Sequence, residues 1–257
     1  MALSHAGDGR SLLSAADGSP LASFGTATTG DVRWLTGVTV APGADPNVVA
    51  TALLAELPGH RAETEDDALV TALVARGGRV QRRAHDYVRD LTVGIPDDWA
   101  EPALPAGWRL APASDAAGLA GPHAAAYPVG HPDHNPDLDH ARELDGMITG
   151  KILGPLVPEA SWQAERVGVP RGAAVVVNRP AFGEMSARLW LIELFLHPDD
   201  TGLGIGTALL RRSLAGAAAA GHQLMGLVVS DGNPARELYE KVGFTLVMSG
   251  TSVDLPG

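Results

Sequence analysis

Residues 191–207 read LIELFLHPDDTGLGIGT, so a strongly apolar segment runs into a loop with glycine at 202, 204 and 206. A helix is expected to follow over residues 207–220. Glycines let a ligand approach the backbone, and a helix start offers unpaired N–H groups and the positive end of the helix dipole. The stretch predicts a strand, an anion-binding loop and a helix, with phosphate as the favoured anion. A glycine-rich turn that only allows close helix–strand packing is the alternative.

Composition excludes several other kinds of protein. The chain has 257 residues, no cysteine and a formal net charge of −11. The charge disfavours nucleic acid and anionic membranes as main partners, and the lack of cysteine excludes disulfides and thiolate chemistry. Neither Lys151 nor Lys241 lies in a Walker loop, which excludes that type of nucleotide hydrolysis. No signal peptide or membrane-spanning stretch is seen, so a cytoplasmic protein is expected.

Residue patterns divide the chain into four parts. Residues 1–20 are rich in Gly and Ser and are expected to be disordered, 21–95 form a first α/β block, 96–107 a linker with several prolines, and 108–257 a second domain. The first block is expected to contain strands at 32–40 and 78–91 and helices at 47–57 and 65–76. The second is expected to contain strands at 108–110, 161–167, 173–178, 188–196, 223–230 and from 244, with helices at 115–126, 138–153, 207–220 and 234–242.

The glycine loop can be compared with the loops of two families of nucleotide-binding proteins. A dinucleotide fold requires G-x-G-x-x-G directly after a strand, whereas this loop has G-x-G-x-G with residues 197–201 in between. Asp231, after the next strand, could take the place of the ribose-binding acid. In contrast, the loop resembles the pyrophosphate loop of the GNAT acetyltransferase superfamily. The resemblance lies in Leu196-His197-Pro198 followed by Thr201-x-x-Gly204-x-Gly206. The family usually has Gln or Arg at the position of Thr201.

A second motif strengthens this resemblance. Residues 233–244, NPARELYEKVGF, resemble the family's signature Asn…Ala…Leu-Tyr-x-x-x-Gly-Phe. The two motifs occur in the family's order, and the resemblance covers roughly residues 108–257. It implies an α/β fold with a mixed, mostly antiparallel sheet flanked by helices. It also implies that the parallel strands 188–196 and 223–230 splay apart to admit acetyl-CoA.

The resemblance further implies direct transfer of acetyl from acetyl-CoA to an amine. Tyr239 stands at the position of the family's general acid, and Glu193 is the conspicuous carboxylate of the strand on which many members carry a base. A packed aromatic is the alternative for Tyr239, and a structural carboxylate for Glu193.

The remaining candidates concern the cofactor and the acceptor amine. The resemblance assigns acetyl-CoA binding to Leu194, Phe195, Leu196, Thr201, Gly202, Leu203, Gly204, Ile205, Gly206, Thr207 and Asn233. Asn233 is equally well explained as an N-cap before Pro234. Tyr127, His131 and His134 are expected at the acceptor pocket, where they would suit a cationic or polar amine. The loop around these histidines is rich in proline and Asx turns, so no metal is expected.

The first block resembles a degenerate copy of the same unit. Val40-Ala41-Pro42 matches Leu196-His197-Pro198 in order, but no glycine loop follows, and Leu73 falls at the tyrosine position. We therefore expect an N-terminal GNAT-like half without cofactor chemistry, with a coincidental α/β block as the alternative. The predicted function is an N-acetyltransferase for a small-molecule or peptide amine. A non-catalytic acyl-CoA-binding regulator and a nucleotide-dependent oxidoreductase are the alternatives. The acceptor and the oligomeric state stay open.

Overall fold

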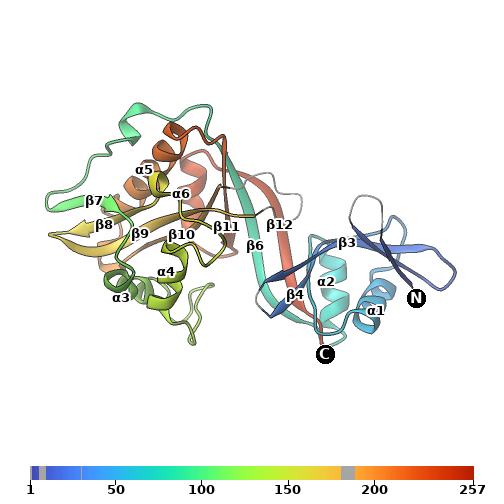
Figure 1. Cartoon of the computed structure of the whole chain (residues 1–257). Helices are drawn as coiled ribbons and strands as arrows, with labels where there is room; N and C mark the ends of the chain where they lie inside the picture. Colours follow the sequence, from blue (N-terminus) through green and yellow to red (C-terminus); the bar gives the residue numbers. More distant parts are fainter. Residues whose placement is uncertain (1, 6–9, 30, 181–188) are drawn as a thin grey trace. The chain divides into compact units, whose positions relative to one another are not determined.

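The computed structural model describes residues 2–5, 10–29, 31–180 and 189–257, which divide into two units (Figure 1). In the described part, unit 1 comprises residues 2–85 and 248–257, and unit 2 comprises residues 86–180 and 189–247. The expected boundary at residues 96–107 is wrong, because that segment belongs to unit 2 and Trp99 within it is buried in the unit's core.

Unit 1 is a sheet with two helices. Its elements are β1 (Ala2–His5), β2 (Ser11–Ser14), β3 (Pro20–Thr29), β4 (Val32–Val40), α1 (Pro46–Glu56), β5 (Arg61–Thr64), α2 (Asp67–Val74) and parts of β6 (Arg79–Asp90) and β12 (Thr245–Asp254). The strand order is β1-β2-β3-β4-β5-β12, with β4 and β5 parallel. Asp45 and Asp66 cap α1 and α2 with their carboxylates, as expected of Asx residues at helix starts.

The N-terminal segment corrects a second expectation. Residues 1–20 were expected to be disordered, but β1 and β2 pair antiparallel, and β2 pairs with β3. The reason is Leu13, which is fully buried in the core of unit 1 and so stabilises a short strand amid Gly and Ser turns.

Unit 2 contains the remaining elements. They are η1 (Asp97–Trp99), β7 (Trp108–Pro112), α3 (Ala116–Ala126), α4 (His140–Ile148), η2 (Pro158–Ala160), β8 (Trp162–Arg166), β9 (Val169–Asn178), β10 (Leu189–Leu196), η3 (Pro198–Asp200), α5 (Ile205–Ala219), β11 (Leu224–Ser230) and α6 (Ala235–Lys241). The strand order is β6-β11-β10-β9-β8-β7, in which β10 and β11 are parallel while β7, β8, β9 and β10 pair antiparallel. The predicted mixed, mostly antiparallel sheet flanked by helices is confirmed.

Two predicted helices in unit 2 have different bounds in the structure, and one predicted strand boundary is not described. The helix expected to begin at residue 207 begins at Ile205. The helix expected over 138–153 ends at Ile148, because Gly150 adopts a φ of 74° that stops helical hydrogen bonding. Residue 188 of the strand expected at 188–196 lies outside the described residues.

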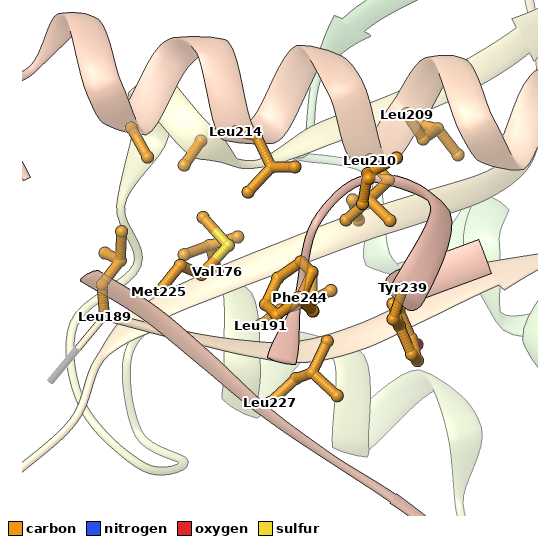
Figure 2. Close-up of a cluster of buried hydrophobic side chains, with 14 of the residues drawn as sticks. Val176, Leu189, Leu191, Leu209, Leu210, Leu214, Met225, Leu227, Tyr239 and Phe244 are labelled. Atoms are coloured by element: carbon orange, nitrogen blue, oxygen red, sulfur yellow. The ribbon is translucent and has the colours of Figure 1, made fainter. Parts of the chain in front are cut away.

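Helices cover both faces of the unit 2 sheet. On one face, α5 packs over the strands and forms the α5-side core, in which Leu209, Leu210 and Leu214 contact side chains of β9, β10 and β11 (Figure 2). On the other face, α3 and α4 form the α3-side core, which includes Leu119, Leu144, Met147, Val175 and Phe195. The functional candidates on β10 therefore lie between two packed layers.

Gly216 permits the close approach of α5 to η2. A Cβ at this position would collide with the carbonyl oxygen of Glu159. Gly216→Ala is expected to lower the free energy of unfolding by about 2 kcal/mol, because backbone overpacking outweighs the helix propensity of alanine. Urea unfolding measures this, with Gly206→Ala in the same helix as control, since its Cβ would lie 3.9 Å from Leu238. Equal stability of both variants would contradict the packing argument.

Candidate active site

The site begins where β10 and β11 stop pairing. Their described register covers Leu189 with Met225 and Trp190 with Gly226. Immediately afterwards, β10 contains a bulge, because Leu191 and Glu193 oppose successive residues of β9. A bulge inserts an extra residue and bends its strand. The carboxyl-terminal half of β10 therefore lies beyond the described pairing with β11, as the predicted splaying requires.

The glycine loop leaves the start of α5 open to a ligand. Gly202 and Gly204 both adopt a φ of 79°, and a Cβ on either would meet nothing within 4 Å. Gly204 is the N-cap of α5 and offers no side-chain cap, and the first backbone bond of the helix runs from Ala208 N–H to the Gly204 carbonyl. The N–H groups of residues 205–207 are thus available to an anion, and the helix dipole favours negative charge there.

A pocket of about 300 Å³ adjoins this helix start. Its lining consists of Asp98, Pro102, Ala103, Gly204, Thr207, Ala208 and Arg211. Arg211 was missed by sequence analysis. In the sequence Arg211 is an ordinary helix residue one turn after Thr207, and only the pocket makes it a candidate.

A buried ion pair holds the loop that precedes the glycines. The side chain of Asp200 is fully buried and lies 2.6 Å from Nε of Arg171 and 3.5 Å from Nη1 of Arg166. His197 accepts a hydrogen bond from the N–H of Asp199 and caps η3. These contacts fix the loop before it reaches Gly202.

Glu193 is held from the α3 side of the sheet. The hydroxyl of Tyr127 donates a 2.7 Å hydrogen bond to Oε2 of Glu193, and Nε2 of His123 lies 3.5 Å from Oε1. Tyr127 was expected at the acceptor pocket, and the structure places it directly on the candidate base. His123 was not predicted, because its place beside Glu193 depends on how α3 crosses the sheet.

Tyr239 projects from α6 at the edge of the α5-side core (Figure 2). Its side chain is 7% exposed and packs edge-on against Phe244, with ring centroids 5.9 Å apart. Burial raises the pKa of Tyr239 above its usual range, and the charges of Glu193 and Asp133 raise it further. The hydroxyl therefore stays protonated at neutral pH, and it lies close enough to Glu193 to sense its charge.

The loop between α3 and α4 reaches the end of β11. The Asp133 carboxylate accepts hydrogen bonds from the hydroxyl of Ser230 and, at 3.1 Å, from the amide of Asn233. Asn233 also accepts from the N–H of Ala235 at 2.9 Å, so the N-cap role considered for it is present.

The two histidines predicted for the acceptor pocket support this same loop. Nδ1 of His134 lies 2.8 Å from the carbonyl of Tyr127, and Nδ1 of His131 accepts from the N–H of Asp133. Among the residues that the structure describes, no three His, Asp or Glu side chains are arranged to hold a metal ion.

Comparisons with known proteins show what this chain resembles. Residues 124–244 match the model of the acetyltransferase (GNAT) family. A GCN5-related N-acetyltransferase from Sphaerobacter thermophilus is 16% identical, with a TM-score of 0.61 over 98% of this chain and 82% of that one. A tandem GNAT protein from the clavulanic acid biosynthesis pathway is 16% identical, with a TM-score of 0.53 over 93% of this chain and 80% of that one.

A third solved structure has the same fold. A GCN5-related N-acetyltransferase from Kribbella flavida is 18% identical, with a TM-score of 0.50 over 88% of this chain and 81% of that one. No curated protein sequence matches. Residues 124–244 thus form a domain that matches the GNAT family model, and the chain shares the fold of solved GNAT structures. Within its described residues, no helix is long and apolar enough to cross a membrane.

The raised pKa values of the tyrosines predict that the protein loses stability at alkaline pH. Burial raises the pKa of Tyr87, Tyr127 and Tyr239, the three tyrosines of the chain. Above pH ~10 the unfolded chain loses tyrosine protons that the native chain retains, so stability falls by up to about 1.4 kcal/mol per pH unit for each tyrosine. Tyrosinate absorbance at 295 nm is expected to appear only together with loss of secondary structure. Ionisation of all three tyrosines in the folded protein would contradict their burial.

Proposed function

We propose that unit 2 transfers acetyl from acetyl-CoA directly to a primary amine, with Glu193 as general base and Tyr239 as general acid. The observation that carries this proposal is the position of Glu193 just past the described pairing of β10 with β11, close enough to Tyr239 for its charge to raise the pKa of that hydroxyl. A base and an acid are thus available to one reaction centre. The uncapped start of α5 would bind the cofactor phosphates.

The residues at the start of α5 fit the phosphates of coenzyme A. Gly202 and Gly204 supply left-handed backbone with open space above it, and the uncapped N–H groups supply hydrogen-bond donors. Arg211, at the adjoining pocket, adds a positive charge. The backbone of residues 194–196, beyond the described pairing with β11, would hold the pantetheine arm and the thioester carbonyl.

The chemical steps follow from the two ionisable groups. When bound, acetyl-CoA supplies an activated acetyl thioester. Glu193 removes a proton from the acceptor ammonium, which frees the nitrogen lone pair for attack on the thioester. As the C–S bond breaks, Tyr239, kept protonated by its environment, donates its proton to the departing thiolate. The second proton that the attacking nitrogen loses restores the tyrosine hydroxyl.

The acceptor proposed is a cationic amine. Among the described residues, the partners of Glu193 are the hydroxyl of Tyr127 and the imidazole of His123, with no Lys or Arg. The carboxylate therefore has no fixed counter-charge of its own, and an incoming ammonium would provide one.

Unit 1 is proposed to lack this activity. The helix α1, which follows Pro42 in sequence as α5 follows Pro198, is capped by the carboxylate of Asp45, which accepts from the N–H of Asn47 at 2.8 Å. Leu73, at the tyrosine position, is fully buried. A helix start already occupied by a carboxylate repels phosphate, so one acetyl-CoA site per chain is expected.

Calorimetric titration with acetyl-CoA tests the binding half of the proposal. We expect one site per chain and an affinity about tenfold weaker in Arg211→Met, which removes a charge-assisted contact. Arg212→Met is the matched control, because Arg212 instead packs on Trp162, 4.1 Å from the ring centroid, and donates to the carbonyl of Ala100. Two sites per chain would contradict the inactive unit 1, and no binding would contradict the proposed function.

Steady-state release of coenzyme A tests the chemical half. The panel comprises cadaverine, glucosamine and glycine, and cadaverine should be the best acceptor because glycine carries a carboxylate beside its amine. Tyr239→Phe is expected to lower kcat about a hundredfold without changing the affinity for acetyl-CoA. Glu193→Gln should abolish the acid limb of the pH–rate profile, on which activity rises with pH.

Tyr87→Phe is the control for Tyr239→Phe, because the Tyr87 hydroxyl donates to Glu240 and does not take part in the proposed chemistry. Parallel loss of binding and turnover in Tyr239→Phe would show a packing role. Tight acetyl-CoA binding without release for any amine would instead indicate a non-catalytic acyl-CoA-binding protein.

A further inference from the structure

His123 is a buried imidazole in the middle of the α3-side core. Its side chain is 1% exposed and lies in edge contact with three other rings, those of Tyr127, His140 and Phe195. A buried polar ring is costly unless both of its nitrogens have partners. The positions of these two nitrogens therefore indicate what the residue does.

The Nδ1 atom of His123 faces another imidazole. It lies 2.8 Å from Nδ1 of His140, which begins α4 and is half-buried. At this distance one nitrogen must carry the proton and the other must accept it. Two arrangements are possible, and in each the tautomer of His123 depends on which ring donates.

The surroundings of Nε2 of His123 distinguish between these two proton arrangements. It lies 3.5 Å from Oε1 of Glu193 and has no hydrogen-bond partner among the described residues. If His123 donated from Nδ1, its bare Nε2 lone pair would face a carboxylate, which is repulsive. If His140 donates instead, the proton of His123 lies on Nε2 and points at Glu193, which is favourable. A separation of 3.5 Å is longer than a full hydrogen bond, and such contacts in active sites tighten when substrate binds.

We infer that His123, in a tautomer fixed by His140, is a positioning residue that donates its Nε2–H to Glu193 and orients the carboxylate for the acceptor amine. The inference rests on the proposed function, in which Glu193 is the base. Tyr127 then donates to one carboxylate oxygen and His123 to the other. Two donors restrain the plane of the carboxylate, and each oxygen keeps a lone pair for the ammonium.

Among the described residues, the titratable groups near the His123–His140 pair include Asp139 and His134, whose charges act on His140. From the elements packed against α3, β10 presents Glu193, α4 presents His140, and β9 presents Ala173 and Val175. Asp200, in η3, is paired with arginine. Tyr127 completes the set from the end of α3 itself.

His140 is the outer member of the pair. Burial lowers the pKa of His140, and the neighbouring His123 lowers it further, while Asp139 and Glu193 oppose these effects. The ring of His140 is therefore neutral at neutral pH, with a single proton. When that proton is on Nδ1, it fixes the tautomer of His123.

Two matched pairs of variants test the inference. His123→Gln keeps a donor near the Nε2 position and His123→Leu removes it, while His140→Asn keeps a donor near Nδ1 and His140→Leu removes it. With cadaverine as acceptor, His123→Leu is expected to lower kcat/KM about tenfold at pH 7. It should also change the pH–rate profile, which a loss of packing alone would not do. His140→Leu should show a smaller change in the same direction, and the Gln and Asn variants should stay close to the parent. His222→Gln, in the turn before β11, controls for the loss of a histidine.

The tautomer is measured without any acceptor. In ¹⁵N-histidine-labelled protein, two-bond ¹⁵N–¹H spectra should show the His123 proton on Nε2 in the parent and in His140→Asn, and a mixture of tautomers in His140→Leu. A proton on Nδ1 of His123, or Leu variants with the pH profile of the parent, would overturn the inference. If the tautomer is as expected but no amine is acetylated, the proposed function fails and the histidine arrangement stands.

Discussion

The extra residue in β10 is the constraint on which the site depends. Side chains alternate across a strand, and Leu189 and Leu191 both lie in the α5-side core. Continued alternation would place Glu193 in that same apolar layer. The bulge at Ile192 changes the phase, so that Phe195 packs in the α3-side core while Leu194 and Leu196 pack toward α5. One inserted residue thus turns the carboxylate toward α3 and, at the same point, ends the described pairing with β11.

This change of face gives Glu193 its partners. On the α5 side it would meet leucines, and an ionised carboxylate there would be strongly destabilising. On the α3 side it meets the hydroxyl of Tyr127 and the ring of His123. The Tyr239 hydroxyl lies within electrostatic reach of Glu193 from α6. The placement of the proposed base therefore follows from a single irregularity in one strand.

Local patterns predicted the elements well, and tertiary packing explains what they missed. Periodicity and turn chemistry located β4, α3 and α6 to within a residue or two. The two motifs predicted roles for the glycine loop and Tyr239, and the carboxylate in an apolar strand predicted one for Glu193. The strands β1, β2 and β5 have four residues each, too few to show alternation, and they are ordered by pairing partners distant in sequence. Likewise Arg211 and His123 are ordinary helix residues in sequence. They become candidates only once the pocket beside α5 and the crossing of α3 over β10 are known.

The two helix starts α1 and α5 show how the same local architecture can keep or lose an anion site. At α5, Gly204 leaves the first N–H groups without a side-chain cap, and the positive end of the helix is open. At α1, the carboxylate of Asp45 accepts a hydrogen bond from the first turn and contributes a negative charge of its own. Asp at an N-cap stabilises a helix by roughly 1 kcal/mol relative to alanine, and glycine gives up only a few tenths of this. The glycine start of α5 therefore costs little stability and leaves its N–H groups open to an anion, which is why α5 rather than α1 is the proposed place for acetyl-CoA.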